Sequence, residues 1–186
     1  DTSVWKGIAQ DAIVMNTDDM ACAGAIDDIV LSNTIGRNKK LIPGEVVKAI
    51  IDGTQEFIQK MNDLNCTIIS AGGETADVGD IVRTADVGFT AFARYPRKKV
   101  KDMQIQPGDV VVSIASYGQA SYEDEYNSGI GSNGLTFARH EVLNKLYAEK
   151  YPESFEPGLD DDVVYTGMHQ VTDLHEESGY SIGKLL

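Results

Sequence analysis

The most limiting feature of this sequence is a long helical stripe of apolar residues that lies between two short apolar strands. From Val46 to Met61, apolar side chains recur at spacings of three and four residues, and Pro43 stands where a first-turn proline belongs. The flanking segments Ile29–Leu31 and Thr67–Ser70 have the length and composition of buried strands. A helix with one apolar face must cover an apolar surface, and neighbouring strands can supply it.

Further helices and strands are predicted on both sides of this segment. A helical stripe from Trp5 to Met20 precedes it, with Thr2 or Ser3 as its cap and Gly24 as its end. Three elements follow it: an alternating strand at Val87–Ala93, an apolar strand at Val110–Ile114 and a third helix at Leu135–Tyr147. This order predicts the α/β class, as a layer sandwich with a mixed sheet and helices on one or both faces.

The pattern also suggests where the domain ends. Residues 1–150 are predicted to form one domain, and residues 151–186 a connector, because the periodicity weakens from Tyr151 onward and prolines and glycine interrupt it. Residues 116–133 form a loop whose length is typical of functional or disordered segments. The basic run Arg97–Lys99 is predicted to be a solvated loop after a strand.

The composition and the lengths of the apolar runs argue against two classes of protein, those that bind nucleic acid and those that span a membrane. The chain has 186 residues with 29 acidic and 16 basic side chains, giving a net charge of -13. That balance opposes nucleic-acid binding, which depends on Lys and Arg, but is compatible with a nucleotide enzyme whose carboxylates hold Mg²⁺. No apolar run approaches the ~20 residues that cross a membrane. The two cysteines, Cys22 and Cys66, are predicted to be buried, reduced thiols of a cytoplasmic protein.

Three short stretches are candidates for binding chemistry. Asp18 and Asp19 lie near the end of the first helix, where carboxylates oppose the helix dipole; they either hold a cation or are simply solvated. The run Gly72-Gly73-Glu74-Thr75 follows a buried strand, where it forms either a ligand site or a tight turn. Ser132-Asn133-Gly134 opens the third helix, as an anion cradle or as an ordinary cap.

Taken in order, these stretches resemble aminoimidazole ribonucleotide (AIR) synthetase, the phosphoribosylformylglycinamidine cyclo-ligase family. The likeness includes Asp18-Asp19 with Gly24-Ala25, the run Gly72–Ala76, Gly108–Val110 and Ser132–Gly134. It extends from about Gly7 to His140 and corresponds to the ATP-binding, N-terminal half of the family's subunit. The resemblance implies an α/β domain whose sheets pair into a dimeric barrel, and hence a homodimer.

The resemblance also implies an activity and a set of roles. The enzyme would use ATP and Mg²⁺ to close the imidazole ring of formylglycinamidine ribonucleotide in purine biosynthesis. Asp19 would be the metal and phosphate carboxylate, with Asp18 beside it where the family has Asn. Gly72, Gly73, Glu74 and Thr75 would line the ATP site, and Ser132, Asn133 and Gly134 would bind the substrate's phosphate or ribose.

Some features depart from the family, and two other functions stay open. Gly131 stands where the family usually has His, and the loop from Gln119 to Ser128 is longer than usual. The family's upstream Gly-Thr-Lys segment and its second domain are missing from these residues, so we expect this piece alone not to turn over. The alternatives are another ATP phosphotransferase of the same superfamily, resembling thiamine-monophosphate kinase, and a non-catalytic nucleotide-binding dimerisation module.

Overall fold

The computed structural model describes residues 2–115, 117–121, 123–126 and 132–186. The chain divides into two compact units, residues 1–107 and residues 108–186, and each is considered by itself. This division concerns compactness alone, and the domain boundary expected at residue 150 stays a prediction. Residues 127–131, which include Gly131 and directly precede α3 (Ser132–Val142), lie outside the described residues.

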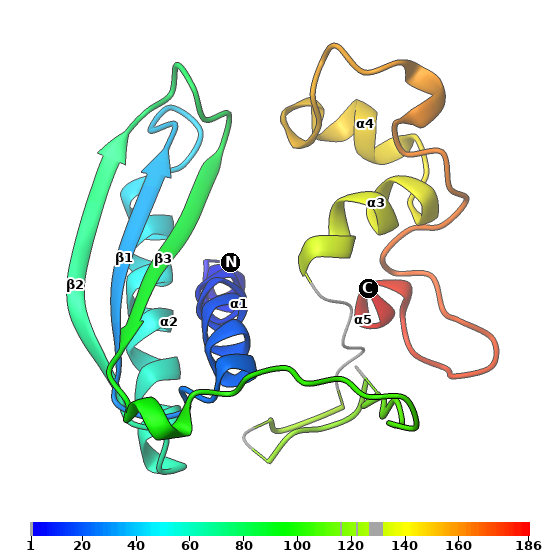
Figure 1. The fold of residues 1–186 in the computed structure, drawn as a ribbon. Helices are drawn as coiled ribbons and strands as arrows, with labels where there is room; N and C mark the ends of the chain where they lie inside the picture. Colours follow the sequence, from blue (N-terminus) through cyan, green and yellow to red (C-terminus); the bar gives the residue numbers. More distant parts are fainter. Residues whose placement is uncertain (1, 116, 122, 127–131) are drawn as a thin grey trace. The chain divides into compact units, whose positions relative to one another are not determined.

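The first unit is a mixed three-stranded sheet with two long helices (Figure 1). A short 3-10 turn, η1 (Ser3–Trp5), precedes the elements, which run in the order α1 (Lys6–Ala23), β1 (Ile29–Arg37), α2 (Gly44–Asp63), β2 (Ile68–Asp77) and β3 (Ala85–Ala93). The strand order is β2-β1-β3, with β2 parallel and β3 antiparallel to the central β1. The predicted α/β class and mixed sheet are confirmed. The predicted burial of the cysteines is wrong, because Cys22 is exposed on α1 and Cys66 is half-buried.

The ends of the two helices show how local sequence sets these elements. Gly24 ends α1 in the left-handed conformation, at φ 91°, as predicted. The predicted cap is wrong: α1 begins after η1 with Trp5 at its N-cap position, and no side chain caps it. Pro43 is the N-cap residue of α2, because its fixed φ suits a helix entrance and its missing N–H costs nothing there. Asn62 then holds the start of β2, since its side chain both accepts from and donates to the backbone of Ile68.

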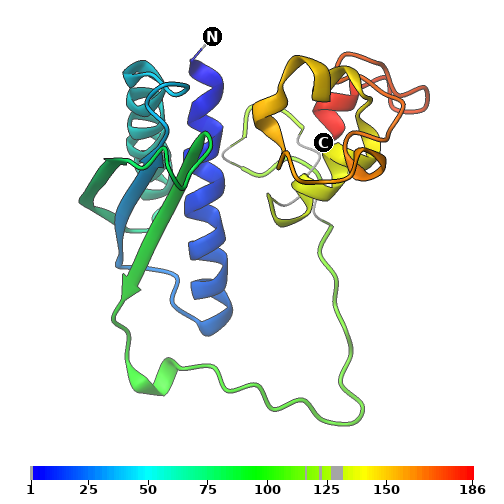
Figure 2. The same ribbon diagram turned by 90° about the horizontal axis from the view of Figure 1, so that it is seen from above.

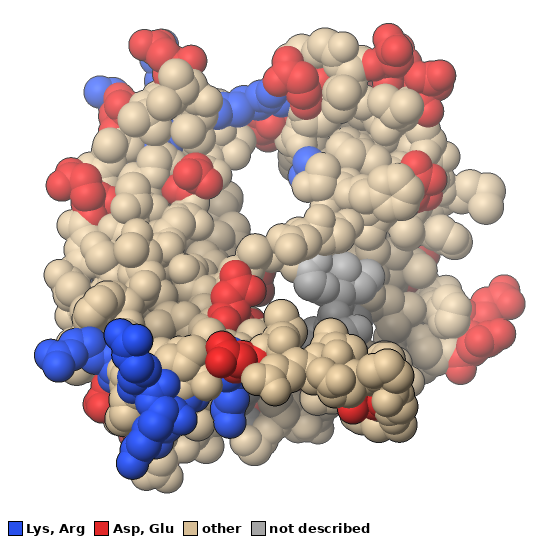
Figure 3. Space-filling view, viewed as in Figure 1, with Lys and Arg blue, Asp and Glu red and all other residues tan. Residues whose placement is uncertain are grey.

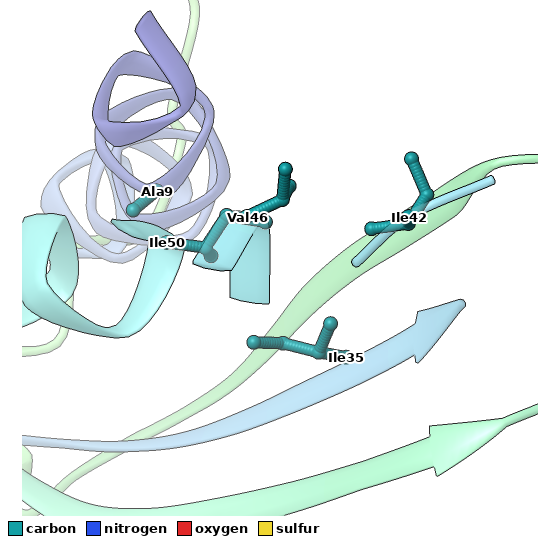
Figure 4. Packing of buried hydrophobic residues seen from close by; sticks show 5 residues of the cluster. All are labelled: Ala9, Ile35, Ile42, Val46 and Ile50. Atoms are coloured by element: carbon teal, nitrogen blue, oxygen red, sulfur yellow. The ribbon is translucent and has the colours of Figure 1, made fainter. Parts of the chain in front are cut away.

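Both helices cover the same face of the sheet (Figures 1 and 2). The central cluster brings together α1, β1, the loop after β1 and α2, through Ala9, Ile35, Ile42, Val46 and Ile50 (Figure 4). Where α1 crosses α2, a Cβ on Gly53 would lie 2.7 Å from the Cα of Lys6, so glycine permits the close approach of the helices. The Lys6 ammonium also pairs with Glu56 at 2.6 Å on the surface of this contact.

Among the described residues of this unit, no helix covers the opposite face of the sheet. Alternate residues of β1, starting with Ile29, are buried against the helices, so Val30 points to the other face. Its register partners on the two flanking strands are Ile69 and Phe92, which are 52% and 59% exposed. The three side chains form an apolar row across the uncovered face at one end of the sheet.

The second unit contains short helices and a small core. Its elements are α3 (Ser132–Val142), α4 (Leu146–Lys150), η3 (Pro152–Ser154), η4 (Asp161–Val163) and α5 (Ile182–Leu185). The core consists of Leu143, Val164, Tyr165 and Ile182. Residues from the predicted connector therefore pack against the end of α3.

Two predictions about this unit are wrong. The segment Val110–Ile114 is not a strand in the described structure; its four apolar side chains, Val110, Val111, Val112 and Ile114, are 80–96% exposed. The third helix does not continue to Tyr147 but ends at Val142, because the N–H of Asn144 donates instead to the carbonyl oxygen of His169.

Candidate nucleotide-binding site

The two candidate metal carboxylates lie on the surface of α1. Both Asp18 and Asp19 are exposed. Asp19 and Ala23 are four residues apart and share one flank of the helix, whereas Asp18 points about 100° away from Asp19. The described residues contain no group of three or more His, Cys, Asp or Glu side chains that could hold a metal ion. Magnesium often binds one or two carboxylates together with phosphate oxygens, and this arrangement suits that mode.

The paired glycines form a bulge inside β2, not a turn at the strand's end. The register with β1 shifts between Leu31 and Asn33, where β2 carries one extra residue. Gly72 has a φ of 82°, a value that only glycine adopts readily. A Cβ on Gly73 would lie 2.1 Å from the carbonyl oxygen of Asn33. Both glycines are therefore needed for the strand to pair, whatever else they contact.

Because β2 continues through the bulge to Asp77, Glu74 and Thr75 point to opposite faces of the sheet. Thr75 pairs with Ile35, which is buried against the helices, so Thr75 is on the helix side. Glu74 pairs with Thr34 on the uncovered face. The prediction that this run follows the end of the strand is wrong, because the bulge keeps both glycines inside the ladder; of the two alternatives, this also removes the tight turn.

The first unit does not bring Asp19 and Glu74 together. Helix α1 packs against α2 and β3, whereas Glu74 belongs to β2, the strand at the other edge. Asp19 also lies near the end of α1 that leads into the start of β1, and Glu74 pairs with a residue in the second half of β1. Within this unit, the two carboxylates predicted for the ATP site therefore lie on opposite sides of the sheet.

Sequence reasoning missed a pocket at the carboxyl ends of the parallel strands β1 and β2. It has a volume of about 430 Å³ and is lined by residues 38–40 after β1 and 77–81 at the end of β2. The ammonium of Lys39 lies 3.2 Å from Asp77, and the N–H of Lys39 donates to the same carboxylate. These hydrogen bonds hold the pKa of Asp77 below its usual range. Carboxyl ends of parallel strands are common ligand positions, which was the signal available in the sequence.

The third candidate stretch lies in the second unit. Ser132, Asn133 and Gly134 form the first turn of α3, and all three are exposed. Later in α3, His140 is buried, and its Nδ1 accepts a hydrogen bond from the N–H of Tyr165. Burial lowers the pKa of His140, with a smaller contribution from the neighbouring Arg139 charge. His140 is thus a hydrogen-bonded core residue of the second unit.

Comparisons with known proteins show the family to which this chain belongs. Residues 2–94 match the family described as AIR synthase related protein, N-terminal domain. The chain belongs to this family. It is 34% identical over 152 residues to the phosphoribosylformylglycinamidine cyclo-ligase of Pyrococcus furiosus, covering 80% of this chain and 38% of that protein. Proteins of the same name from Saccharolobus solfataricus and Thermococcus kodakarensis are 30% and 33% identical, over 81% and 80% of this chain and 41% and 38% of theirs.

Membership in the AIR synthase related family confirms the predicted resemblance. The chain spans about two fifths of the length of these curated relatives. In the described part of the chain, no helix is both long and apolar enough to cross a membrane.

Proposed function

We propose that this chain is the nucleotide-binding part of an ATP-dependent cyclo-ligase that closes the imidazole ring of formylglycinamidine ribonucleotide in purine biosynthesis, in the cytoplasm. The observation that carries the proposal is the family match over residues 2–94, together with 30–34% identity to relatives named as this cyclo-ligase. The exposed carboxylates on α1 support it, because they suit a magnesium ion shared with phosphates.

Each candidate residue then has a defined task. Bound ATP would supply the phosphoryl group that activates the formyl oxygen of the substrate. Asp19, with Asp18 beside it, would hold the Mg²⁺ that accompanies the phosphates. Glu74 and Thr75 would line the nucleotide site from β2, each on its own face of the sheet, while Gly72 and Gly73 would fix the strand that carries them. Ser132, Asn133 and Gly134 form the exposed first turn of α3, a position where backbone N–H groups and the helix dipole would favour a phosphate of the substrate.

We also propose that the uncovered sheet face pairs with a second copy of the chain. The row formed by Ile69, Val30 and Phe92 exposes apolar side chains on a sheet face that no helix of this unit covers. A homodimer would bury this row, and joined sheets would produce the family's barrel. Sedimentation should detect a dimer at micromolar concentration that Phe92→Asp dissociates, whereas a stable wild-type monomer would contradict the pairing.

Titration calorimetry with Mg-ATP tests the metal assignment. Asp19→Asn should weaken binding substantially, because a bound divalent ion loses a charged ligand; Asp18→Asn should have a smaller effect. The two variants remove the same charge from adjacent surface positions, so each controls for the other. Equal losses in both variants would contradict the assigned role of Asp19.

A further inference from the structure

A dense group of cations follows β3 in this otherwise acidic chain. Five basic residues lie within eight positions, and all five are exposed: Arg94, Arg97, Lys98, Lys99 and Lys101. We call this stretch the basic segment. Figure 3 shows Lys and Arg side chains gathered at the end of the first unit where η2 (Arg97–Lys99) lies. Among the described residues, none of the five lies within ion-pair distance of a carboxylate.

The basic segment is held against the carboxyl end of α1. The Tyr95 hydroxyl donates a hydrogen bond of 3.0 Å to the carbonyl oxygen of Ala23. A Cβ on Gly24 would lie 3.2 Å from Cγ of Lys101 and 3.3 Å from the carbonyl oxygen of Lys99, so this stretch of chain touches the helix end. Cations there complement the helix dipole, but one or two would suffice for that purpose.

This contact brings the basic segment close to Asp19. Asp19 and Ala23 lie one above the other on one flank of α1, about 6 Å apart along the helix axis. Ala23 is the residue that Tyr95 contacts, so the segment begins about one helical turn beyond the candidate metal carboxylate. A polyphosphate held through Mg²⁺ at Asp19 is long enough to reach cations at this distance.

We propose that the basic segment binds the phosphates of the nucleotide whose Mg²⁺ is held by Asp19. The inference rests on the proposed function, and it assigns the positive charge that none of the three candidate stretches contains. Lys99 and Lys101 are its central residues, because the carbonyl oxygen of Lys99 and the side-chain stem of Lys101 lie beside Gly24 at the end of α1. Lysine ammonium groups bind phosphate as point charges without a fixed geometry, as an exposed segment requires.

Binding of Mg-tripolyphosphate and of Mg-ATP by the chain of residues 1–186 tests this proposal by calorimetry. The double variant Lys99→Gln/Lys101→Gln should weaken both about tenfold, and its affinity should depend less steeply on salt than that of the wild type. The control, Lys48→Gln/Lys60→Gln, removes the same charge from α2 and should change affinity less than twofold. Circular dichroism confirms that each variant is folded.

The outcomes separate this proposal from the function on which it rests. Mg-ATP binding that is equally affected, or unaffected, in both double variants overturns the role of the basic segment and leaves the cyclo-ligase proposal standing. Tripolyphosphate binding that depends on Lys99 and Lys101, with no binding of Mg-ATP, supports the anion site and contradicts the nucleotide function. Absence of binding by either ligand to the wild type overturns both.

Discussion

Replacing Gly73 by alanine should lower the stability of the first unit far more than the same replacement at another strand glycine. The new Cβ would lie 2.1 Å from the carbonyl oxygen and 2.8 Å from the carbonyl carbon of Asn33 in the central strand. These atoms are backbone, so relief requires β2 to move away from β1. Overpacking costs about 1–3 kcal/mol, and each weakened ladder hydrogen bond adds about 1 kcal/mol. We therefore expect Gly73→Ala to cost about 3 kcal/mol.

Gly88→Ala provides the matched control, because Gly88 also lies inside a strand paired with β1 but has no atom within 4 Å of an added Cβ. Thermal unfolding can be followed by the fluorescence of the single tryptophan, Trp5, which packs against the core of this unit. The Tm of Gly73→Ala should fall by roughly 10–20 °C, while that of Gly88→Ala should change by only a few degrees. Similar Tm values for the two variants would refute the assigned bulge geometry.

Two further effects follow from the backbone and the core. At Gly72, whose φ is 82°, Gly72→Asn should be tolerated better than Gly72→Val by about 1–2 kcal/mol in urea unfolding, and equal stabilities would contradict the left-handed assignment. The stability of the second unit should fall as pH decreases below about 6.5. The reason is that burial lowers the folded-state pKa of His140, so the unfolded chain takes up the proton first. His140→Gln should flatten this dependence in urea midpoints measured at pH 7.5 and 5.5, and an unchanged slope would exclude His140 as its source.

Helix α2 was predictable because it repeats an apolar stripe over many turns, whereas α1 was predicted from a weaker stripe, of which Ala9 and Ile13 are buried. The spacing from Val46 to Met61 predicted α2, and Gly24 marked the end of α1. The cap of α1 was not predictable, because a 3-10 turn precedes the helix and moves its start beyond Thr2 and Ser3. Local sequence alone does not distinguish a side-chain cap from such a turn.

Strand lengths depended on partners that sequence periodicity does not show. The apolar run predicted β1 only as Ile29–Leu31, whereas pairing on both sides extends it to Arg37 through polar residues on the uncovered face. Val110–Ile114 shows the opposite case, since an apolar run without a partner in the described structure is not a strand. Apolar composition indicates that a segment can pair, but the ladder itself determines whether it does.

The sequence identified the candidate site residues, but only the structure shows the direction in which each side chain points. Glu74 and Thr75 are neighbours in the chain. The paired glycines before them did not suggest that the strand continues, and so did not show that the two side chains point to opposite faces of the sheet. The run Arg97–Lys99 within the basic segment was predicted as a solvated loop; it forms the short 3-10 helix η2, and its side chains are exposed as expected. Its contact with the end of α1 could not be inferred, because Tyr95 and Ala23 are far apart in the sequence.

The opposite orientations of Asp19 and Glu74 lead to a last prediction. Asp19 belongs to the helix layer, whereas Glu74 is on the face of the sheet that the helices leave uncovered. Because the two side chains lie on opposite sides of one sheet, we expect a site that contains both to take one of them from another copy. Glu74→Gln should then weaken Mg-ATP binding only where the protein is dimeric. In the monomeric Phe92→Asp background, Glu74→Gln should add no further loss, whereas Asp19→Asn should still weaken binding. A further loss from Glu74→Gln in the monomer would show that both carboxylates act within one unit, against the geometry of β2.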